Sequence, residues 1–338
     1  MFYPVLAHCT FDKSPTVSII LFEIAILVGS GIAIFFLSKI KDKILPRFLI
    51  MAIGVLIFEL FTAPMWHNYR LGRWAYLYLD VSWILTVGWT GLILAVTLLI
   101  DRLLVEWKAG QRFLVYLGIL TVSVTFLEAI VVNLGIRSYA PEVLADMTGI
   151  FIFGVPIIEV FYYTPVFTGL VISFYKYWEF ALDEEPLIPS KQRKWLRSLS
   201  IAFIAVFMFE VMIQPMVNNE NFPEWSYLFF DISFLLTGLW VFIIGIAAII
   251  GEKFFLHLPL FYRFLIVLGI TGAIALPLES WLIVNGYRVY GESALHSFIG
   301  IEMPVTGVPI EIAFAIPCYM ALIITFIRYW EIILDNRL

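Results

Sequence analysis

Several acidic residues lie inside long apolar stretches of this chain, and most of them are present in two copies. The first set comprises Glu59, Asp80, Glu128 and Glu159. Glu210, Asp231 and Glu279 repeat the first three at one offset, and Glu311 approximates the fourth. An ionised acid in such surroundings costs several kcal/mol, so these residues usually face the interior of a helical bundle and serve function. Four acids at one depth would repel each other if all were ionised. We therefore expect protonated acids beside ionised ones, which supplies proton donors and proton acceptors.

The residues around the acids repeat with the same offset. The matching residues of the first copy are Phe58, Trp74, Tyr76, Asp80, Ser82, Thr86, Trp89, Glu128, Gly135, Arg137 and Tyr139. Their counterparts are Phe209, Trp225, Tyr227, Asp231, Ser233, Thr237, Trp240, Glu279, Gly286, Arg288 and Tyr290. The chain therefore contains an internal duplication that preserves acids, and not merely apolar filler.

Composition places these residues in a membrane. The chain is 62% hydrophobic and only 14% charged, which a soluble domain does not tolerate. Apolar runs long enough to cross a bilayer as helices recur along it. We predict an all-α integral membrane protein with about nine spans, near 17–39, 48–65, 75–100, 113–135, 150–175, 196–217, 226–250, 262–285 and 304–327. These runs are not expected to be strands, because they are long and lack alternation with a period of two.

The duplication divides the chain into an anchor and two repeats. Residues 1–46 form an N-terminal anchor helix, 47–182 the first four-helix repeat, 183–197 a cytoplasmic linker and 198–338 the second repeat. Because each repeat has an even number of spans, the two copies should lie parallel in the membrane.

The distribution of Lys and Arg predicts the orientation. Sixteen of these residues fall on one side of the predicted spans and five on the other, which places the N-terminus outside and the C-terminus in the cytoplasm of a prokaryotic cell. We expect the lipid bilayer as a partner and no nucleic acid, because no basic patch is present. The sequence leaves open whether the chain forms a homo-oligomer.

The sequence lacks the residue patterns that several kinds of functional site require. His67, His257 and His296 have no metal-ligand spacing, and Cys9 and Cys318 lie at opposite ends of the chain. Carboxylates alone could hold a hard cation, but we expect no metal and no cofactor. A Ser-His-Asp arrangement, a phosphate loop, a dinucleotide fingerprint and a mid-span lysine for a retinal Schiff base are all missing.

Basic and aromatic residues beside the acids are candidates for substrate binding. Arg137 and Arg288 follow predicted spans, where each could pair with an acid or lie among headgroups. Tyr139 and Tyr290 fit equally an interfacial belt or the site. Trp74 and Trp225 keep their places in both copies, and an aromatic wall would suit a polyene or a carbocation.

The end of each repeat resembles a known family. The first carries Glu128-x6-Gly135-Ile136-Arg137-Ser138-Tyr139 and then Gly154-Val155-Pro156-Ile157-Ile158-Glu159. The second carries Glu279-x6-Gly286-Tyr287-Arg288-Val289-Tyr290 and then Gly307-Val308-Pro309-Ile310-Glu311. This order of acid, glycine, aromatic and proline-then-glutamate elements is similar to the membrane lycopene cyclase domain. The chain departs from that pattern in its single glutamate and in an arginine where tryptophan is usual.

The resemblance implies a lycopene cyclase-like isomerase of carotenoid or isoprenoid biosynthesis. Such an enzyme protonates the end of a hydrophobic polyene, and ring closure or hydration follows without redox change. Under this reading Glu128 with Glu159, and Glu279 with Glu311, are acid and base, while Glu59, Asp80, Glu210 and Asp231 tune their protonation. The alternatives are a proton- or cation-coupled transporter and a non-catalytic carotenoid- or lipid-binding protein.

Overall fold

The computed structural model describes residues 15–145, 149–183 and 195–336. Within that part of the chain, eight helices are long and apolar enough to span a membrane, which confirms the predicted all-α membrane class. The chain divides into two compact units, Met1–Tyr175 with Arg337–Leu338, and Lys176–Asn336. This division falls near the boundary predicted between the repeats, although α6 belongs to both units.

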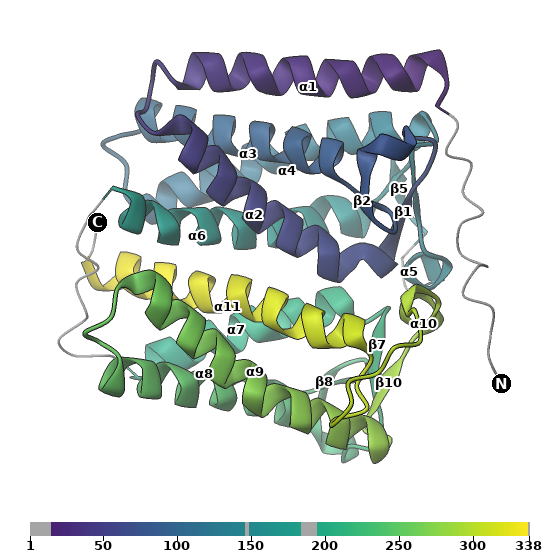
Figure 1. The fold of residues 1–338 in the computed structure, drawn as a ribbon, viewed down its shortest axis with the longest axis vertical. Coiled ribbons are helices and arrows are strands. Elements are labelled where there is room, and N and C mark those ends of the chain that lie inside the picture. Colours follow the sequence, from purple (N-terminus) through teal and green to yellow (C-terminus); the bar gives the residue numbers. More distant parts are fainter. Residues whose placement is uncertain (1–14, 146–148, 184–194, 337–338) are drawn as a thin grey trace. The chain divides into compact units, whose positions relative to one another are not determined.

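The first unit is a bundle built around one central helix. Its long helices are α1 (Val17–Leu37), α2 (Ile44–Thr62), α3 (Trp83–Leu103), α4 (Ala109–Asn133) and α6 (Thr164–Leu182), the last of which runs on into the second unit. Helix α3 packs against α1, α2 and α4 (Figure 1). A helix of about 20 residues spans about 30 Å, the thickness of the hydrocarbon core of a bilayer.

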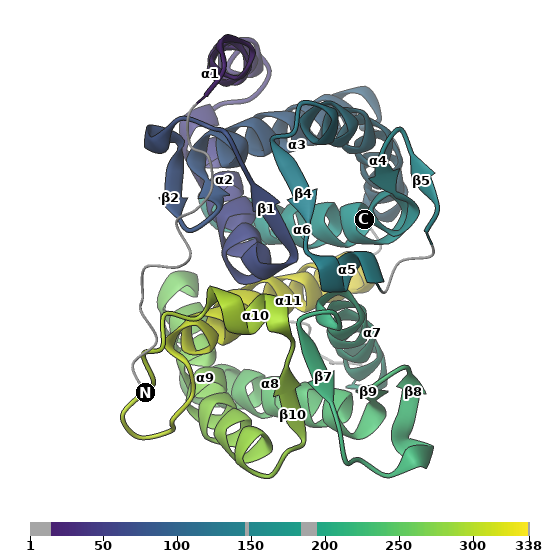
Figure 2. The same cartoon turned by 90° about the vertical axis from the view of Figure 1, so that its right-hand side faces the viewer.

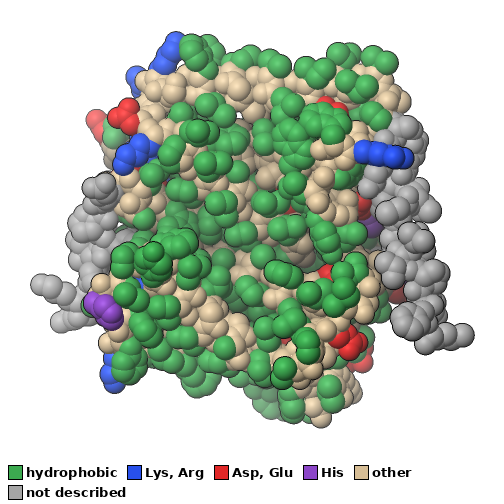
Figure 3. All heavy atoms as spheres, viewed as in Figure 1, with side chains coloured by type: hydrophobic (Ala, Val, Ile, Leu, Met, Phe, Trp, Pro, Cys, Tyr) green, Lys and Arg blue, Asp and Glu red, His purple; other side chains and the backbone are tan. Residues whose placement is uncertain are grey.

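Small residues let α1 approach α3 closely. The Ser30 hydroxyl donates to the Val87 carbonyl at 3.4 Å, and a Cβ placed on Gly91 would lie 3.2 Å from the Ser30 oxygen. Because lipid tails are as apolar as leucine, membrane helices associate through such close contacts. The opposite face of α1 exposes mainly apolar side chains such as Leu21, Val28 and Phe35. Hydrophobic side chains likewise dominate the molecular face in Figure 3.

Short strands lie at one end of the first unit's helices (Figure 2). Strand β1 (Trp66–Asn68) pairs antiparallel with β4 (Arg137–Tyr139), β2 (Tyr76–Tyr78) with β3 (Val81–Ser82), and β5 (Phe151–Ile152) with β6 (Val155–Pro156). A short helix, α5, covers Pro141–Ala145. The membrane-spanning elements are thus helices, as predicted, and these strands of two or three residues lie outside them.

The second unit repeats this plan. Its helices are α7 (Trp195–Ile213), α8 (Phe234–Phe254), α9 (Leu260–Val284), the short α10 (Glu292–Ser297) and α11 (Ile310–Asn336). Strand β7 (Val217–Asn219) pairs with β10 (Arg288–Tyr290), and β8 (Tyr227–Phe229) with β9 (Ile232–Ser233). An isolated bridge between Glu302 and Pro309 stands where the first unit has β5 and β6.

Several predicted span boundaries were wrong. The runs at 75–100 and 226–250 begin too early, because the apolar hairpins β2–β3 and β8–β9 precede α3 and α8. The run at 150–175 begins in a hairpin, continues through a π-helical turn at Glu159–Tyr163 and ends in α6. Residues 184–194 of the predicted linker lie outside the described residues. The orientation in the membrane and the parallel placement of the repeats stay predictions.

The duplication extends to unusual backbone angles. Positive φ occurs at Arg70, Leu79 and Gly135 and again at their counterparts Asn221, Phe230 and Gly286. Positive φ is uncommon outside glycine, so its return at matched residues that differ in type shows that the copies share one loop geometry.

Gly135 ends α4 and turns the chain back toward it. Its φ is 66°, and the N–H groups of Gly135 and Ile136 donate to the carbonyls of Val132 and Val131. This left-handed residue is the usual way for a helix to end while satisfying its last carbonyls. As a result β4 returns alongside the last turns of α4.

Gly135→Ala is expected to destabilise the protein by about 1–2 kcal/mol, the cost of a side chain in the left-handed region. The new Cβ would also lie 3.1 Å from a guanidinium nitrogen of Arg70. Thermal unfolding in detergent measures the change. Gly118→Ala on the same helix is the control, because nothing lies within 4 Å of its Cβ position. Equal loss of stability in both variants would contradict this account of the turn.

Candidate functional site

Three acids from separate elements of the first unit converge at the strand end of the bundle. Glu59 lies on the last turns of α2, Glu128 on those of α4, and Glu159 on the π-helical turn before α6. All three are buried, with Glu128 only 1% exposed. The sequence predicted these acids to lie at similar depth, and the structure brings them around one cavity.

The β1–β4 ladder places the Arg137 guanidinium beside Glu128. The turn at Gly135 sends β4 back, and Arg137 pairs in register with Asn68 of β1. The Arg137 Nη1 donates to Glu128 Oε2 at 3.0 Å, while its Nε donates to Asn68 Oδ1 at 3.0 Å. Arg137 is therefore part of the buried site and does not lie among headgroups.

Glu128 also accepts a hydrogen bond from Tyr139, whose hydroxyl lies 3.2 Å from Oε1. Burial raises the pKa of Tyr139 far above its usual range, and the carboxyls of Glu159 and Glu128 raise it further. Burial lowers the pKa of Arg137, but Glu128, Tyr139, Glu59 and Glu159 together outweigh that effect, so the pKa is raised. Both groups thus stay protonated, and both donate to the Glu128 carboxyl.

The other two acids of the cavity, Glu59 and Glu159, have fewer hydrogen-bond donors than Glu128. The Thr86 hydroxyl of α3 donates to Glu59 Oε2 and also bonds the Ser82 carbonyl. Glu159 Oε2 is buried and has no hydrogen-bond partner among the described residues. A buried polar atom without a partner is costly, so such atoms mark places where a ligand or water binds.

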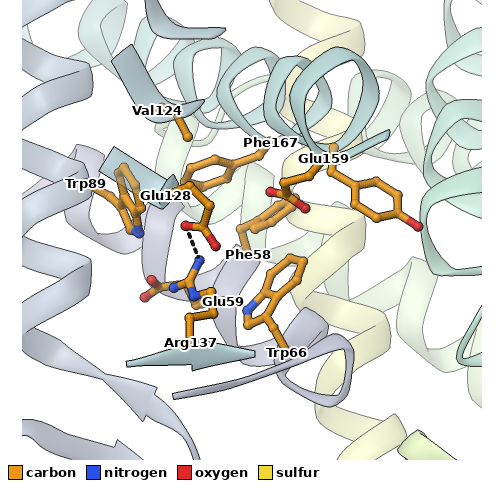
Figure 4. A pocket seen from close by; sticks show the side chains of 10 residues that line it. Phe58, Glu59, Trp66, Trp89, Val124, Glu128, Arg137, Glu159 and Phe167 are labelled. Carbon is orange, nitrogen blue, oxygen red and sulfur yellow. Dashed lines mark hydrogen bonds and ion pairs between the residues drawn. The ribbon is translucent and has the colours of Figure 1, made fainter. Parts of the chain in front are cut away.

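The three acids and Arg137 line a cavity of about 30 Å³ (Figure 4). Its remaining wall is apolar and consists of Phe58, Trp66, Trp89, Val124, Tyr163 and Phe167. The Phe58 and Phe167 rings are 4.6 Å apart, and Arg137 lies 5.8 Å from the Trp66 ring. The cavity therefore combines ionisable groups with aromatic faces.

A second layer of polar residues supports Arg137. Asn68 Nδ2 donates to the Asp80 carbonyl at 2.7 Å, and the Tyr76 hydroxyl donates to the Asn68 carbonyl at 3.0 Å. The Asp80 carboxylate contacts His67 Nδ1 at 2.9 Å. Asp80 lies in the turn of the β2–β3 hairpin and not inside a span, so it acts on the loop that holds Arg137.

The second unit repeats the core of this site. Arg288 Nε lies 3.2 Å from Glu279 Oε1, and Arg288 Nη1 donates to Asn219 Oδ1 at 2.8 Å. The Tyr290 hydroxyl donates to Glu279 Oε1. As in the first unit, an arginine and a tyrosine of the returning strand contact the acid of the long helix.

The supporting acids repeat as well. The Thr237 hydroxyl donates to Glu210, as Thr86 does to Glu59. Asp231 accepts the Asn219 N–H at 2.8 Å in the turn between β8 and β9. Burial raises the pKa of Asp231 above its usual value.

Glu311 differs from its predicted counterpart. Its Oε1 accepts the N–H of Ile299 in the preceding loop at 2.7 Å, and α11 begins as a regular helix at Ile310. In the first unit the π-helical turn carries Glu159, and π turns of this kind often mark functional sites. The buried Tyr319 stacks on Phe209 at 4.4 Å, as Phe167 contacts Phe58, so an aromatic hydroxyl replaces a plain ring there.

Two predicted site residues lie elsewhere. Trp74 and Trp225 are 53% and 69% exposed, and their rings contact Trp83 and Phe234 at the base of α3 and α8. They do not line the acid cavity. Their repetition reflects a conserved hairpin surface.

Sequence reasoning missed Asn68 and Asn219, which hold the two arginines. The signal was present, because the pair keeps the offset of the duplication. It also missed Glu23 of α1, which is 1% exposed and accepts the Gly72 N–H at 2.7 Å. Within the described ranges, no group of three potential ligands could hold a metal ion.

Comparison with known proteins adds no relative: no family model, no curated protein and no solved structure matches this chain.

Proposed function

We propose that the chain is a membrane-embedded enzyme that cyclises or hydrates the end of an isoprenoid polyene by proton transfer, in the manner of a lycopene cyclase. The observation that carries the proposal is the cavity of the first unit, in which three buried carboxyls and one arginine meet aromatic walls. The chain has the long apolar helices of an integral membrane protein, which suits a hydrophobic substrate.

The hydrogen bonds suggest the two roles. Glu128 has two donors and serves as the carboxylate. Glu159 has a buried oxygen without a partner among the described residues, and an ionised acid in that position would be costly. We therefore assign the transferable proton to Glu159. Glu59, bonded to Thr86, is the third carboxyl of the cavity.

The proposed reaction conserves atoms and electrons. The Glu159 carboxyl protonates a terminal C=C, which leaves a carbocation on the adjacent carbon. An internal C=C attacks this centre and forms the ring C–C bond, and Glu128 then removes a proton beside the new cation to restore a double bond. Before the next cycle Glu128 releases its proton to water and Glu159 takes up a proton from water. The faces of Phe58, Trp89 and Phe167 stabilise the cation.

The size of the cavity favours a second candidate. A space of about 30 Å³ holds a few water molecules and not the end of a polyene, so the aromatic wall must move for cyclisation. Waters among three carboxyls would equally suit proton-coupled transport.

Expression in a bacterial host that makes linear carotenoids tests the first candidate. The expected result is a cyclised or hydrated product that the empty host lacks. Proteoliposomes with an imposed proton gradient test the second. Gradient-driven proton flux without any product would replace the enzyme proposal with transport.

A further inference from the structure

The β2–β3 hairpin of the first unit exposes an apolar surface beyond the helix ends. Trp74 and Leu77 are 53% and 55% exposed, and Tyr78 and Leu79 follow them at the hairpin tip. Such a patch is costly in water and marks an interaction surface. The loop is joined to α1 by the Gly72–Glu23 hydrogen bond.

The patch continues onto the lipid-facing surface. Around Glu23, helix α1 exposes Ile20, Leu21 and Ile24, which face lipid in a membrane. The Trp83 indole N–H donates to the Trp74 carbonyl at 2.8 Å, so the hairpin is fixed against the start of α3. The bilayer that covers α1 can therefore cover the hairpin as well.

Two arginines flank this apolar surface. Arg70 and Arg73 are exposed, and neither forms an ion pair with any described residue. By contrast, the buried Arg137 forms an ion pair with Glu128. Leu71 between the two is fully buried, which anchors the segment that carries both guanidinium groups. Arginine binds phosphate through a planar fork of donors.

The second unit provides a natural contrast. Its hairpin exposes Trp225 and Leu228 in the same way, with Phe229 and Phe230 at the tip. At the positions of Arg70 and Arg73, however, it carries Asn221 and Glu224. The two hairpins thus share their apolar surface and differ in flanking charge.

We propose that the β2–β3 hairpin is a binding site for an anionic phospholipid, with Arg70 and Arg73 on its phosphate and Trp74, Leu77 and Leu79 among its acyl chains. The β8–β9 hairpin, which lacks both arginines, should show no preference for anionic lipid. Aromatic rings at this level of a membrane protein are typical of the headgroup region. This proposal is independent of the reaction in the acid cavity.

Lipid-specific quenching tests the proposal. The full chain, with Cys9→Ser and Cys318→Ser, carries a bimane probe on Leu77→Cys or on Leu228→Cys and is placed in nanodiscs. Spin-labelled phosphatidylglycerol and spin-labelled phosphatidylcholine are compared as quenchers. We expect phosphatidylglycerol to be enriched at the Leu77→Cys probe by roughly fivefold for each arginine, and not at the Leu228→Cys probe.

Substitutions and a soluble competitor complete the test. Arg70→Gln/Arg73→Gln should abolish the preference, Arg70→Lys/Arg73→Lys should keep part of it, and Glu220→Gln/Glu224→Gln should not change it. Equal quenching by both lipids, or no quenching at the Leu77→Cys probe, would overturn the proposal. Loss of the preference in the presence of inorganic phosphate would assign the arginines to a soluble anion instead. Helical circular dichroism confirms that each variant is folded.

Discussion

Glu159→Gln is expected to reduce formation of the cyclised product by about 10²–10⁴-fold, the usual contribution of a positioned acid. Glutamine keeps the size of the side chain and cannot transfer the proton. Since Glu159 Oε2 has no partner among the described residues, the substitution breaks no hydrogen bond at that atom. The melting temperature should therefore change little, and product per folded enzyme is the measurement.

Glu311→Gln is the matched control for this loss. Glu311 accepts a backbone N–H from Ile299, and a glutamine carbonyl can accept the same bond. The variant should keep most of the product. Equal loss from Glu159→Gln and Glu311→Gln would remove the distinction between the two units.

Arg137→Met is expected to lower the free energy of unfolding by about 3–5 kcal/mol, because it leaves the Glu128 carboxylate buried without its cation. The Arg137–Glu128 contact of 3.0 Å joins two side chains that are almost inaccessible. Thermal and denaturant unfolding in detergent measures the change. Arg137→Lys should recover only part of it, since lysine cannot bind Glu128 and Asn68 with the same fork.

A double variant separates the ion pair from packing. Glu128→Gln/Arg137→Met should be more stable than Arg137→Met alone, because glutamine carries no charge that needs a partner. Arg288→Met in the second unit should cost similar stability through Glu279 and leave product formation largely intact. A loss below about 1 kcal/mol for Arg137→Met would show that the pair is not a buried determinant of the fold.

The sequence predicted much of this site because the duplication preserves polar residues in apolar surroundings. Glu59 and Glu128 lie where their positions on apolar runs indicated, and their copies Glu210 and Glu279 follow. Whether Arg137 would bind an acid was open, because pairing depends on the reversal at Gly135. Helical periodicity carries no information about that reversal.

Other features depended on local backbone geometry. A π-helical turn has i→i+5 hydrogen bonds, so Glu159 faces another direction relative to α6 than it would at the start of a regular helix. The regular start of α11 gives Glu311 another direction. The prediction that Trp74 lines the cavity was wrong. An apolar hairpin has the same composition as a membrane-spanning helix, and only its hydrogen bonds distinguish the two.

Deuterium incorporation tests the central claim, proton transfer from Glu159 to a polyene, most directly. The purified protein is incubated in D₂O with a linear carotenoid, and the product is analysed by mass spectrometry. The expected result is one solvent-derived deuterium in each new ring, with the product absent from Glu159→Gln and retained in Glu311→Gln. A ring that contains no solvent deuterium, or full product from Glu159→Gln, would contradict the account.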